Sequence, residues 1–183
     1  MSAVVSSGGT APGAPESRRI VLLRHAKADW PEVADHDRPL ADRGRMDAAA
    51  TGSRLASYDL HLDLALCSTS VRTRETWKLA VHELADRPRT IYEERLYEAS
   101  LGELLVLLSE TPDDVADVLV IGHNPGMHAL ADALSGQAEG DALTRINRTG
   151  FPTAGLAVIE FTGPWKSVEH GVGRLTDFWA PHE

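Results

Sequence analysis

The sequence contains a single cysteine, Cys67, and therefore cannot form an intramolecular disulfide. It also lacks any apolar run close to the roughly 18 residues that cross a bilayer. The first 15 residues carry no charged side chain, so the basic region of a secretion signal is missing as well. These absences argue against a disulfide-rich secreted protein and a membrane span, and we expect a cytoplasmic protein.

Basic residues are in the minority. The chain has 18 Lys and Arg against 27 Asp and Glu, which gives a net charge of −9. An acidic surface repels nucleic acid and anionic membranes, so we expect neither as a partner. Any site for an anionic ligand must be a local cluster of basic groups.

With 183 residues the chain fits one domain. Its beginning is rich in Ser, Gly, Ala and Pro, which predicts a disordered tail over residues 1–17. Residues 18–183 are then expected to form one folded domain.

Short apolar runs that alternate with helical periodicity predict the fold. The strands are expected near residues 20–23, 62–67, 90–92, 118–122, 154–161 and 174–179. The helices are expected over residues 42–58, with Asp42 as cap and Met46, Ala49, Ala50 and Ser53 on one face, from the turn after Cys67 to about residue 85, near residues 101–108, and near residues 127–134. This alternation predicts a three-layer α/β/α sandwich with a mostly parallel central sheet.

Polar side chains follow three of the predicted strands. Arg24 and His25 come directly after the first strand, Arg72 lies in the first turn of the helix after the second, and His123 follows residues 118–122. In open α/β sheets ligands bind outside the carboxyl ends of the strands. Two guanidinium groups roughly balance a phosphoryl group, which carries about −1.5 to −2 charges near pH 7. The sequence therefore predicts a phosphate pocket at one edge of the sheet.

The same segments resemble the three signatures of the histidine phosphatase superfamily. They are residues 23–26 (LRHA), 68–76 (STSVRTRET) and 121–126 (IGHNPG). The short length and residues 38–40 (RPL) followed by 43–44 (RG) most resemble its SixA-type phosphohistidine phosphatase branch, with a phosphoglycerate-mutase-like fold.

The resemblance implies hydrolysis that needs no metal and no cofactor. It implies that His25 is the nucleophile and becomes phosphorylated, that Arg24 and Arg72 hold the phosphoryl oxygens, and that His123 donates to the transferring group. A neutral imidazole can attack phosphorus when its other N–H is held by a partner. The expected substrate is phosphohistidine in a protein, with a small phosphorylated compound as the alternative.

Four further residues are candidates at the same edge. Glu98, in the loop after Tyr97, is a candidate proton donor, and an exposed loop carboxylate is the equal alternative. Arg38, Lys27 and Asn124 are candidates for substrate binding. Trp30 is a candidate wall of the substrate site, although packing on the core is the expected role of a loop Trp.

Three other functions are possible from the residue types present: a cysteine-dependent phosphatase, a phosphate-binding module without catalysis, and a metal site. Cys67 precedes Arg72 by four intervening residues rather than the five of cysteine-dependent phosphatases, which weakens that alternative. A binding module without catalysis would not need a nucleophile such as His25. The pair His123 and His128 is spaced i, i+5, off a shared helix face, which argues against a metal site.

Overall fold

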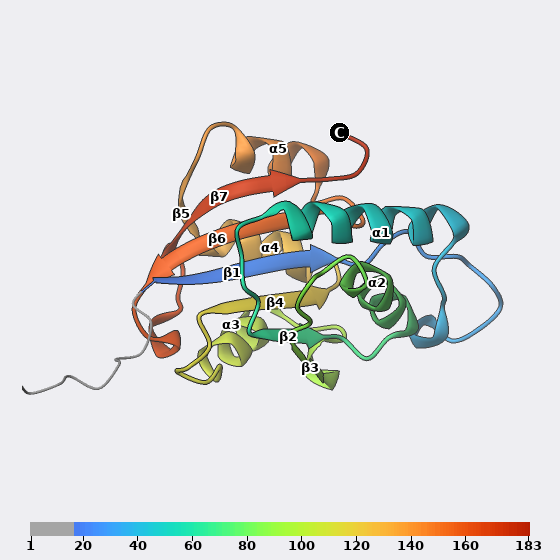
Figure 1. Cartoon of the computed structure of the whole chain (residues 1–183), viewed down its shortest axis with the longest axis horizontal. Helices are drawn as coiled ribbons and strands as arrows, with labels where there is room; N and C mark the ends of the chain where they lie inside the picture. Colours follow the sequence, from blue (N-terminus) through green and yellow to red (C-terminus); the bar gives the residue numbers. More distant parts are fainter. Residues whose placement is uncertain (1–16) are drawn as a thin grey trace, which may run out of the picture.

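The structure is a computed structural model, and it describes residues 17–183. The tail predicted for residues 1–17 lies, except for Ser17, outside the described residues. Seven strands form one sheet in the order β3-β2-β4-β1-β6-β7-β5 (Figure 1). The strands are β1 (Ser17–Arg24), β2 (Leu64–Cys67), β3 (Arg89–Tyr92), β4 (Asp117–Gly122), β5 (Ser135–Ala138), β6 (Leu156–Thr162) and β7 (Gly173–Trp179). All pairs are parallel except β1–β6 and β6–β7.

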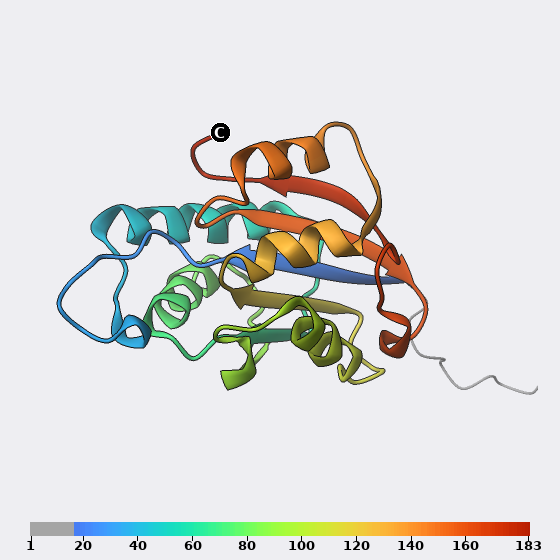
Figure 2. The ribbon, with the colours of Figure 1, turned by 180° about the vertical axis from the view of Figure 1, so that it is seen from behind.

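Five helices cover the two faces of this sheet. They are α1 (Asp42–Ser57), α2 (Val71–Val81), α3 (Leu101–Ser109), α4 (Gly126–Leu134) and α5 (Ala142–Thr149), joined by the short 3-10 turns η1 (Asp35–Asp37), η2 (Glu94–Leu96) and η3 (Trp165–Ser167). Helices α1 and α2 lie on one face, and α3, α4 and α5 lie on the other (Figure 2). The predicted three-layer α/β/α architecture is confirmed.

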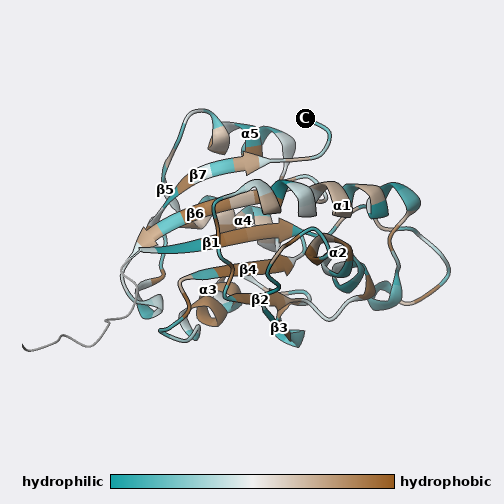
Figure 3. Ribbon diagram, in the orientation of Figure 1, coloured by the Kyte–Doolittle hydropathy of each residue, from teal (hydrophilic) through white to brown (hydrophobic). Residues whose placement is uncertain are grey.

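Strand β1 lies in the middle of the sheet and is buried on both sides. Ile20 and Leu22 pack into the larger core under α3, α4 and α5, whereas Val21 and Leu23 pack under α1 and α2. A strand covered on both faces needs apolar side chains at every position. This explains the unbroken apolar run in the sequence, and Figure 3 shows the same hydrophobic character in β1, β2 and β4.

The register of β1, β2 and β4 sets the position of the polar residues that follow them. Arg24 pairs with Gly122, and Cys67 pairs with Ile121. The backbone N–H of His25 donates to the Gly122 carbonyl at 3.0 Å, which continues the ladder one residue beyond β1. The parallel strands therefore end at the same level.

The predicted apolar face of α1 was wrong. Met46 is 74% exposed, and the helix buries small residues instead, among them Gly44, Ala48 and Gly52. A Cβ atom on Gly52 would lie 2.4 Å from the carbonyl oxygen of Ala80 in α2. Because α1 approaches α2 so closely, the contact face selects small side chains rather than large apolar ones. Asp42 is the first helical residue, and no side chain caps this end of the helix.

Two elements were not predicted from the sequence. Strand β5 has the sequence SGQA and is mostly exposed, and α5 buries only Ala142 and Ile146. Strand β5 has no apolar alternation, and α5 is amphipathic but only eight residues long, so neither was recognised. Helix α2 also ends at Val81, earlier than predicted. Within residues 17–183, no helix has the length and apolar character that crossing a membrane requires.

Candidate active site

His25 stands at the carboxyl end of β1 with one ring nitrogen already bonded. Its Nδ1 lies 2.8 Å from the carbonyl oxygen of Ala26. A carbonyl only accepts, so Nδ1 carries the proton and Nε2 keeps its lone pair. Burial, with the nearby His123, Arg72 and Arg24, lowers the pKa of His25 to about 3. The ring is therefore neutral near pH 7, in the form that a nucleophile needs.

His123, the first residue after β4, faces His25. The two ring centroids are 5.4 Å apart. The Nε2 atom of His123 lies 2.8 Å from the hydroxyl of Ser68, which follows β2. Burial, and next the charge of Arg72, lowers the pKa of His123 to about 4, so this ring is also neutral near pH 7.

Arg72 reaches the same place from the first turn of α2. Ser70 caps this helix by accepting a hydrogen bond from the Thr73 backbone N–H. The guanidinium of Arg72 is buried, and its end is held by one residue of η1. Nη1 donates to the backbone carbonyl of Asp35 at 2.7 Å, and Nη2 donates to the Asp35 carboxylate at 3.0 Å.

Asp35 is the centre of a hydrogen-bond network that sequence analysis did not find. Its carboxylate also accepts from the Tyr97 hydroxyl at 2.5 Å and from Arg38 at 3.1 Å. These bonds, that of Tyr97 foremost, hold the pKa of Asp35 well below its usual range. The sequence signal was weak, because Asp35 lies in a loop among several other acidic residues.

Three buried donors in the site have no hydrogen-bond partner. In residues 17–183, the buried side-chain atoms without a partner are Arg24 Nε, Arg72 Nε, His123 Nδ1 and Thr111 Oγ1. The first three belong to residues gathered around His25. Buried polar groups are normally hydrogen-bonded, and an exception calls for an explanation. Unpartnered buried nitrogens on the residues around one neutral imidazole ring are a group of atoms that would suit an anionic ligand.

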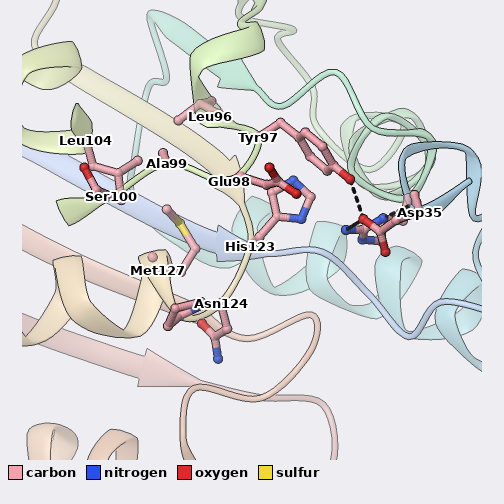
Figure 4. A pocket seen from close by; sticks show the side chains of 13 residues that line it. Asp35, Leu96, Tyr97, Glu98, Ala99, Ser100, Leu104, His123, Asn124 and Met127 are labelled. Carbon is pink, nitrogen blue, oxygen red and sulfur yellow. Dashed lines mark hydrogen bonds and ion pairs between the residues drawn. The ribbon is translucent and has the colours of Figure 1, made fainter. Parts of the chain in front are cut away.

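A cavity of about 420 Å³ opens beside His123 (Figure 4). Asp35, which accepts a hydrogen bond from Arg72, lies at one end of it, and Leu104 and Met127 lie toward the other. Glu98 also lines this cavity and is exposed. The backbone of Glu98 has φ 59°, a conformation that non-glycine residues adopt rarely and that often occurs at functional sites.

The three residues considered for substrate binding differ in position. Asn124 lines the cavity, but its amide donates to the carbonyl oxygens of Gly150 and Phe151. Arg38 bonds Asp35 and stacks on Trp30, with its guanidinium carbon 3.3 Å from the ring centroid. Lys27 is exposed and does not line the cavity. Trp30 is 75% exposed, so the expectation that it packs on the core was wrong, because it covers Arg38 instead.

Arg24 and Cys67 are the two remaining residues that the sequence offers as catalytic groups. Arg24 donates from Nη1 to the carbonyl oxygen of Phe151 at 3.0 Å, which fixes the side chain while Nε stays unpartnered. Cys67 is fully buried, and burial raises the pKa of its thiol to about 12. A thiol of that pKa supplies almost no thiolate near neutrality, which disfavours a cysteine nucleophile.

In the part of the chain described, no group of three or more His, Cys, Asp and Glu is arranged to hold a metal ion.

Comparison with known proteins connects this site to a family. A sequence model of the histidine phosphatase superfamily (branch 1) matches residues 20–114. An uncharacterized protein of Mycobacterium tuberculosis is 40% identical over 162 residues, which make up 87% of this chain and 99% of that protein.

Two solved structures share the whole fold. SixA from Nakamurella multipartitia has a TM-score of 0.81 and 29% identity, covering 93% of this chain and 99% of its own. SixA from Agrobacterium tumefaciens has a TM-score of 0.76 and 34% identity, covering 90% of this chain and 98% of its own. Both are described as proposed phosphohistidine phosphatases.

Proposed function

This chain belongs to the histidine phosphatase superfamily, with a SixA-like fold, and from that premise we propose that it dephosphorylates phosphohistidine in proteins through a phosphorylated His25. The observation that carries the proposal is the group of three unpartnered donors, Arg24 Nε, Arg72 Nε and His123 Nδ1, beside the neutral ring of His25. In this proposal residues 18–183 act as one catalytic domain.

The first step is attack by His25. The lone pair on Nε2 forms a bond to phosphorus while the bond from phosphorus to the leaving nitrogen or oxygen breaks. The leaving atom keeps that electron pair and takes up a proton. The bond between Nδ1 of His25 and the Ala26 carbonyl supports this role, because it holds the ring in the reactive tautomer.

The clamp, meaning Arg24 and Arg72, stabilises the charge on the phosphoryl oxygens. Both side chains are held by backbone carbonyls, of Phe151 and Asp35, so they need little rearrangement when the anion arrives. A Ser68 hydroxyl that donates to Nε2 of His123 leaves the proton of His123 on Nδ1, the unpartnered atom. His123 then donates to the same anion.

The second step releases phosphate. Water attacks phosphorus, the bond to Nε2 of His25 breaks, and its electron pair returns to the ring. The protons of the attacking water go to the departing phosphate and to bulk solvent. No metal ion takes part in either step as proposed.

The leaving group supports phosphohistidine over alkyl phosphates. An alkoxide is very basic and needs a well-placed acid, and the candidate here, Glu98, lies exposed on a loop. Imidazole has an unperturbed pKa of about 6.5 and departs after a proton that is available near neutrality. A site that has a nucleophile and a phosphate clamp but a poorly placed acid therefore suits imidazole, which needs less help to leave than an alkoxide does.

A small phosphomonoester is the second candidate. The cavity of about 420 Å³ is large enough for a compact organic group, and part of its lining is apolar. Aryl esters fit this candidate best, because a phenol leaves more easily than an alcohol.

The cytoplasmic location expected from the composition stays a prediction.

One experiment separates these candidates. The rate of phosphate release from a protein phosphorylated on histidine is compared with rates from an alkyl and an aryl phosphate, all in the presence of a chelator. We expect the phosphohistidine protein to be hydrolysed with the highest kcat/KM and the chelator to have no effect. Loss of all activity in chelator, or equal activity in His25→Ala, would refute the proposal.

A further inference from the structure

The cavity beside His123 carries an unusual charge for a site that receives phosphate. Of the described residues that line it, Asp35 and Glu98 are acidic, and Arg72 is the one Lys or Arg. Arg72 already donates from both Nη atoms to Asp35. Beyond the phosphoryl position, no cation in the lining remains to pair with a second anionic group.

Asp35 is fixed in place from several sides. Tyr97 and Arg38 each donate to its carboxylate, and Arg38 is itself held by stacking on Trp30. The Asp35 side chain is still 51% exposed, compared with 8% for Arg72. Asp35 therefore lines the cavity with a half-exposed side chain while it holds the buried guanidinium of Arg72.

Asp35 keeps its negative charge throughout the neutral range, because its hydrogen bonds, first that from Tyr97, lower its pKa. The pairing with Arg72 neutralises part of this charge toward the clamp. Both carboxylate oxygens already accept hydrogen bonds, but the side chain is about half exposed, so its charge still acts on a group that enters the cavity.

The other end of the cavity is mostly apolar. Leu96, Ala99, Leu104 and Met127 lie there, with the polar Ser100 beside them (Figure 4). A buried anion placed there would lose its hydration without gaining a partner, which is strongly unfavourable. An uncharged or cationic ring meets no such penalty.

We propose that this cavity is a leaving-group subsite that accepts neutral or cationic groups and rejects anionic ones, with Asp35 as the residue that sets the preference. The inference rests on the proposed function, because it assigns the cavity to the part of the substrate that departs from phosphorus. It predicts that phosphorylated acids and bisphosphates are poor substrates, whereas a phosphorylated imidazole fits.

Two aryl phosphates of nearly equal shape test the charge preference. They are 4-carboxyphenyl phosphate, which carries a second anion, and its neutral isostere 4-carbamoylphenyl phosphate. The measured quantity is the ratio of kcat/KM for the acid to kcat/KM for the amide. Comparing this ratio between variants cancels the intrinsic difference between the two leaving groups.

We expect Asp35→Asn to raise the ratio about tenfold. The substitution removes the repulsion between the Asp35 carboxylate and the carboxylate of the ligand, and for partly exposed charges that repulsion is of the size that a tenfold change in kcat/KM represents. Asn keeps the shape and the ability to accept from Arg72. Asp37→Asn is the matched control, since Asp37 lies in the same η1 turn but outside the cavity lining. It should leave the ratio within twofold of the wild type.

If Asp35→Asn also displaced Arg72, the hydrolysis of both esters would slow by the same factor, and the ratio of their kcat/KM values would not change. If Asp35→Asn is too slow to assay, dissociation constants of the two esters are measured by calorimetry in His25→Ala and in His25→Ala with Asp35→Asn. The same tenfold change is expected there. An unchanged ratio in turnover or in binding would overturn the inference.

The proposed function fails in a different way. In that case the wild type would not hydrolyse the phosphohistidine protein, whatever the ratio for the two esters is. A wild type that hydrolyses acid and amide esters equally well would leave the proposed function intact and would overturn only the charge preference.

Discussion

The ring centroids of His25 and His123 lie 5.4 Å apart, although His25 follows β1 and His123 follows β4, far along the chain. Strands β1 and β4 are parallel neighbours, so their carboxyl ends place both rings at one edge of the sheet. Each ring has one nitrogen held by the protein, by the Ala26 carbonyl or by the Ser68 hydroxyl. Each ring thus keeps one nitrogen that makes no hydrogen bond within residues 17–183, and the proposed mechanism assigns these two atoms to the phosphoryl group.

The identity of the nucleophile is the first prediction. His25→Ala should lower kcat by at least about 10³-fold, because it removes the atom that accepts the phosphoryl group. Cys67→Ser should retain most of the activity, since Cys67 is buried and its thiol pKa is raised to about 12. Rapid quenching with labelled substrate should trap an acid-labile adduct. An acid-stable adduct on Cys67 would assign the nucleophile to the thiol instead.

The second prediction concerns Glu98 and the leaving group. Glu98→Gln should slow hydrolysis of an alkyl phosphate about 10²-fold, the usual contribution of a general acid, and that of phosphohistidine much less. Glu103→Gln is a suitable control, because Glu103 is exposed on α3 and does not line the cavity. Equal losses on both substrates would show that the acid matters for either leaving group.

The third prediction concerns stability at acid pH. The pKa of His25 is about 3 in the folded protein and about 6.5 in the unfolded chain, so the unfolded state binds more protons between these values. The free energy of unfolding is therefore highest above about pH 6.5 and falls as the pH decreases toward 3. His25→Gln should reduce the loss between pH 7 and pH 5 by on the order of 1 kcal/mol.

Urea unfolding at the two pH values measures this difference. His61→Gln is the control, because the His61 side chain is 73% exposed. If His25→Gln and the wild type lose the same stability on acidification, burial does not keep the His25 ring neutral.

The fourth prediction tests the close contact between α1 and α2, which positions Arg72. Gly52→Ala would place a methyl group 2.4 Å from the Ala80 carbonyl oxygen and should destabilise the fold by about 1–3 kcal/mol. Gly102→Ala, in α3, meets no atom within 4 Å and should instead stabilise by about 0.5–1 kcal/mol. Thermal unfolding of both variants checks the pair. A neutral Gly52→Ala would mean that the two helices can separate without cost.

The sequence determined the sheet, most of the helices and four residues of the candidate site. The apolar runs around residues 20–23 and 118–122 identify buried parallel strands, and such strands end at one edge for reasons of backbone geometry alone. Arg24, His25, Arg72 and His123 could therefore be brought together without coordinates. The sequence prediction missed α5, which is amphipathic but only eight residues long, and β5, which is mostly exposed.

Only the tertiary structure decided what surrounds those four residues. Asp35, Ser68 and Tyr97 come from loops and turns, whose paths depend on packing against the rest of the fold rather than on local pattern. Asp35 meets Arg72 because η1 lies against α2, and the Tyr97 hydroxyl then reaches the same carboxylate. The positions of the proposed nucleophile and clamp follow from strand order, whereas the charge of the cavity beside them arises from contacts between loops distant in sequence.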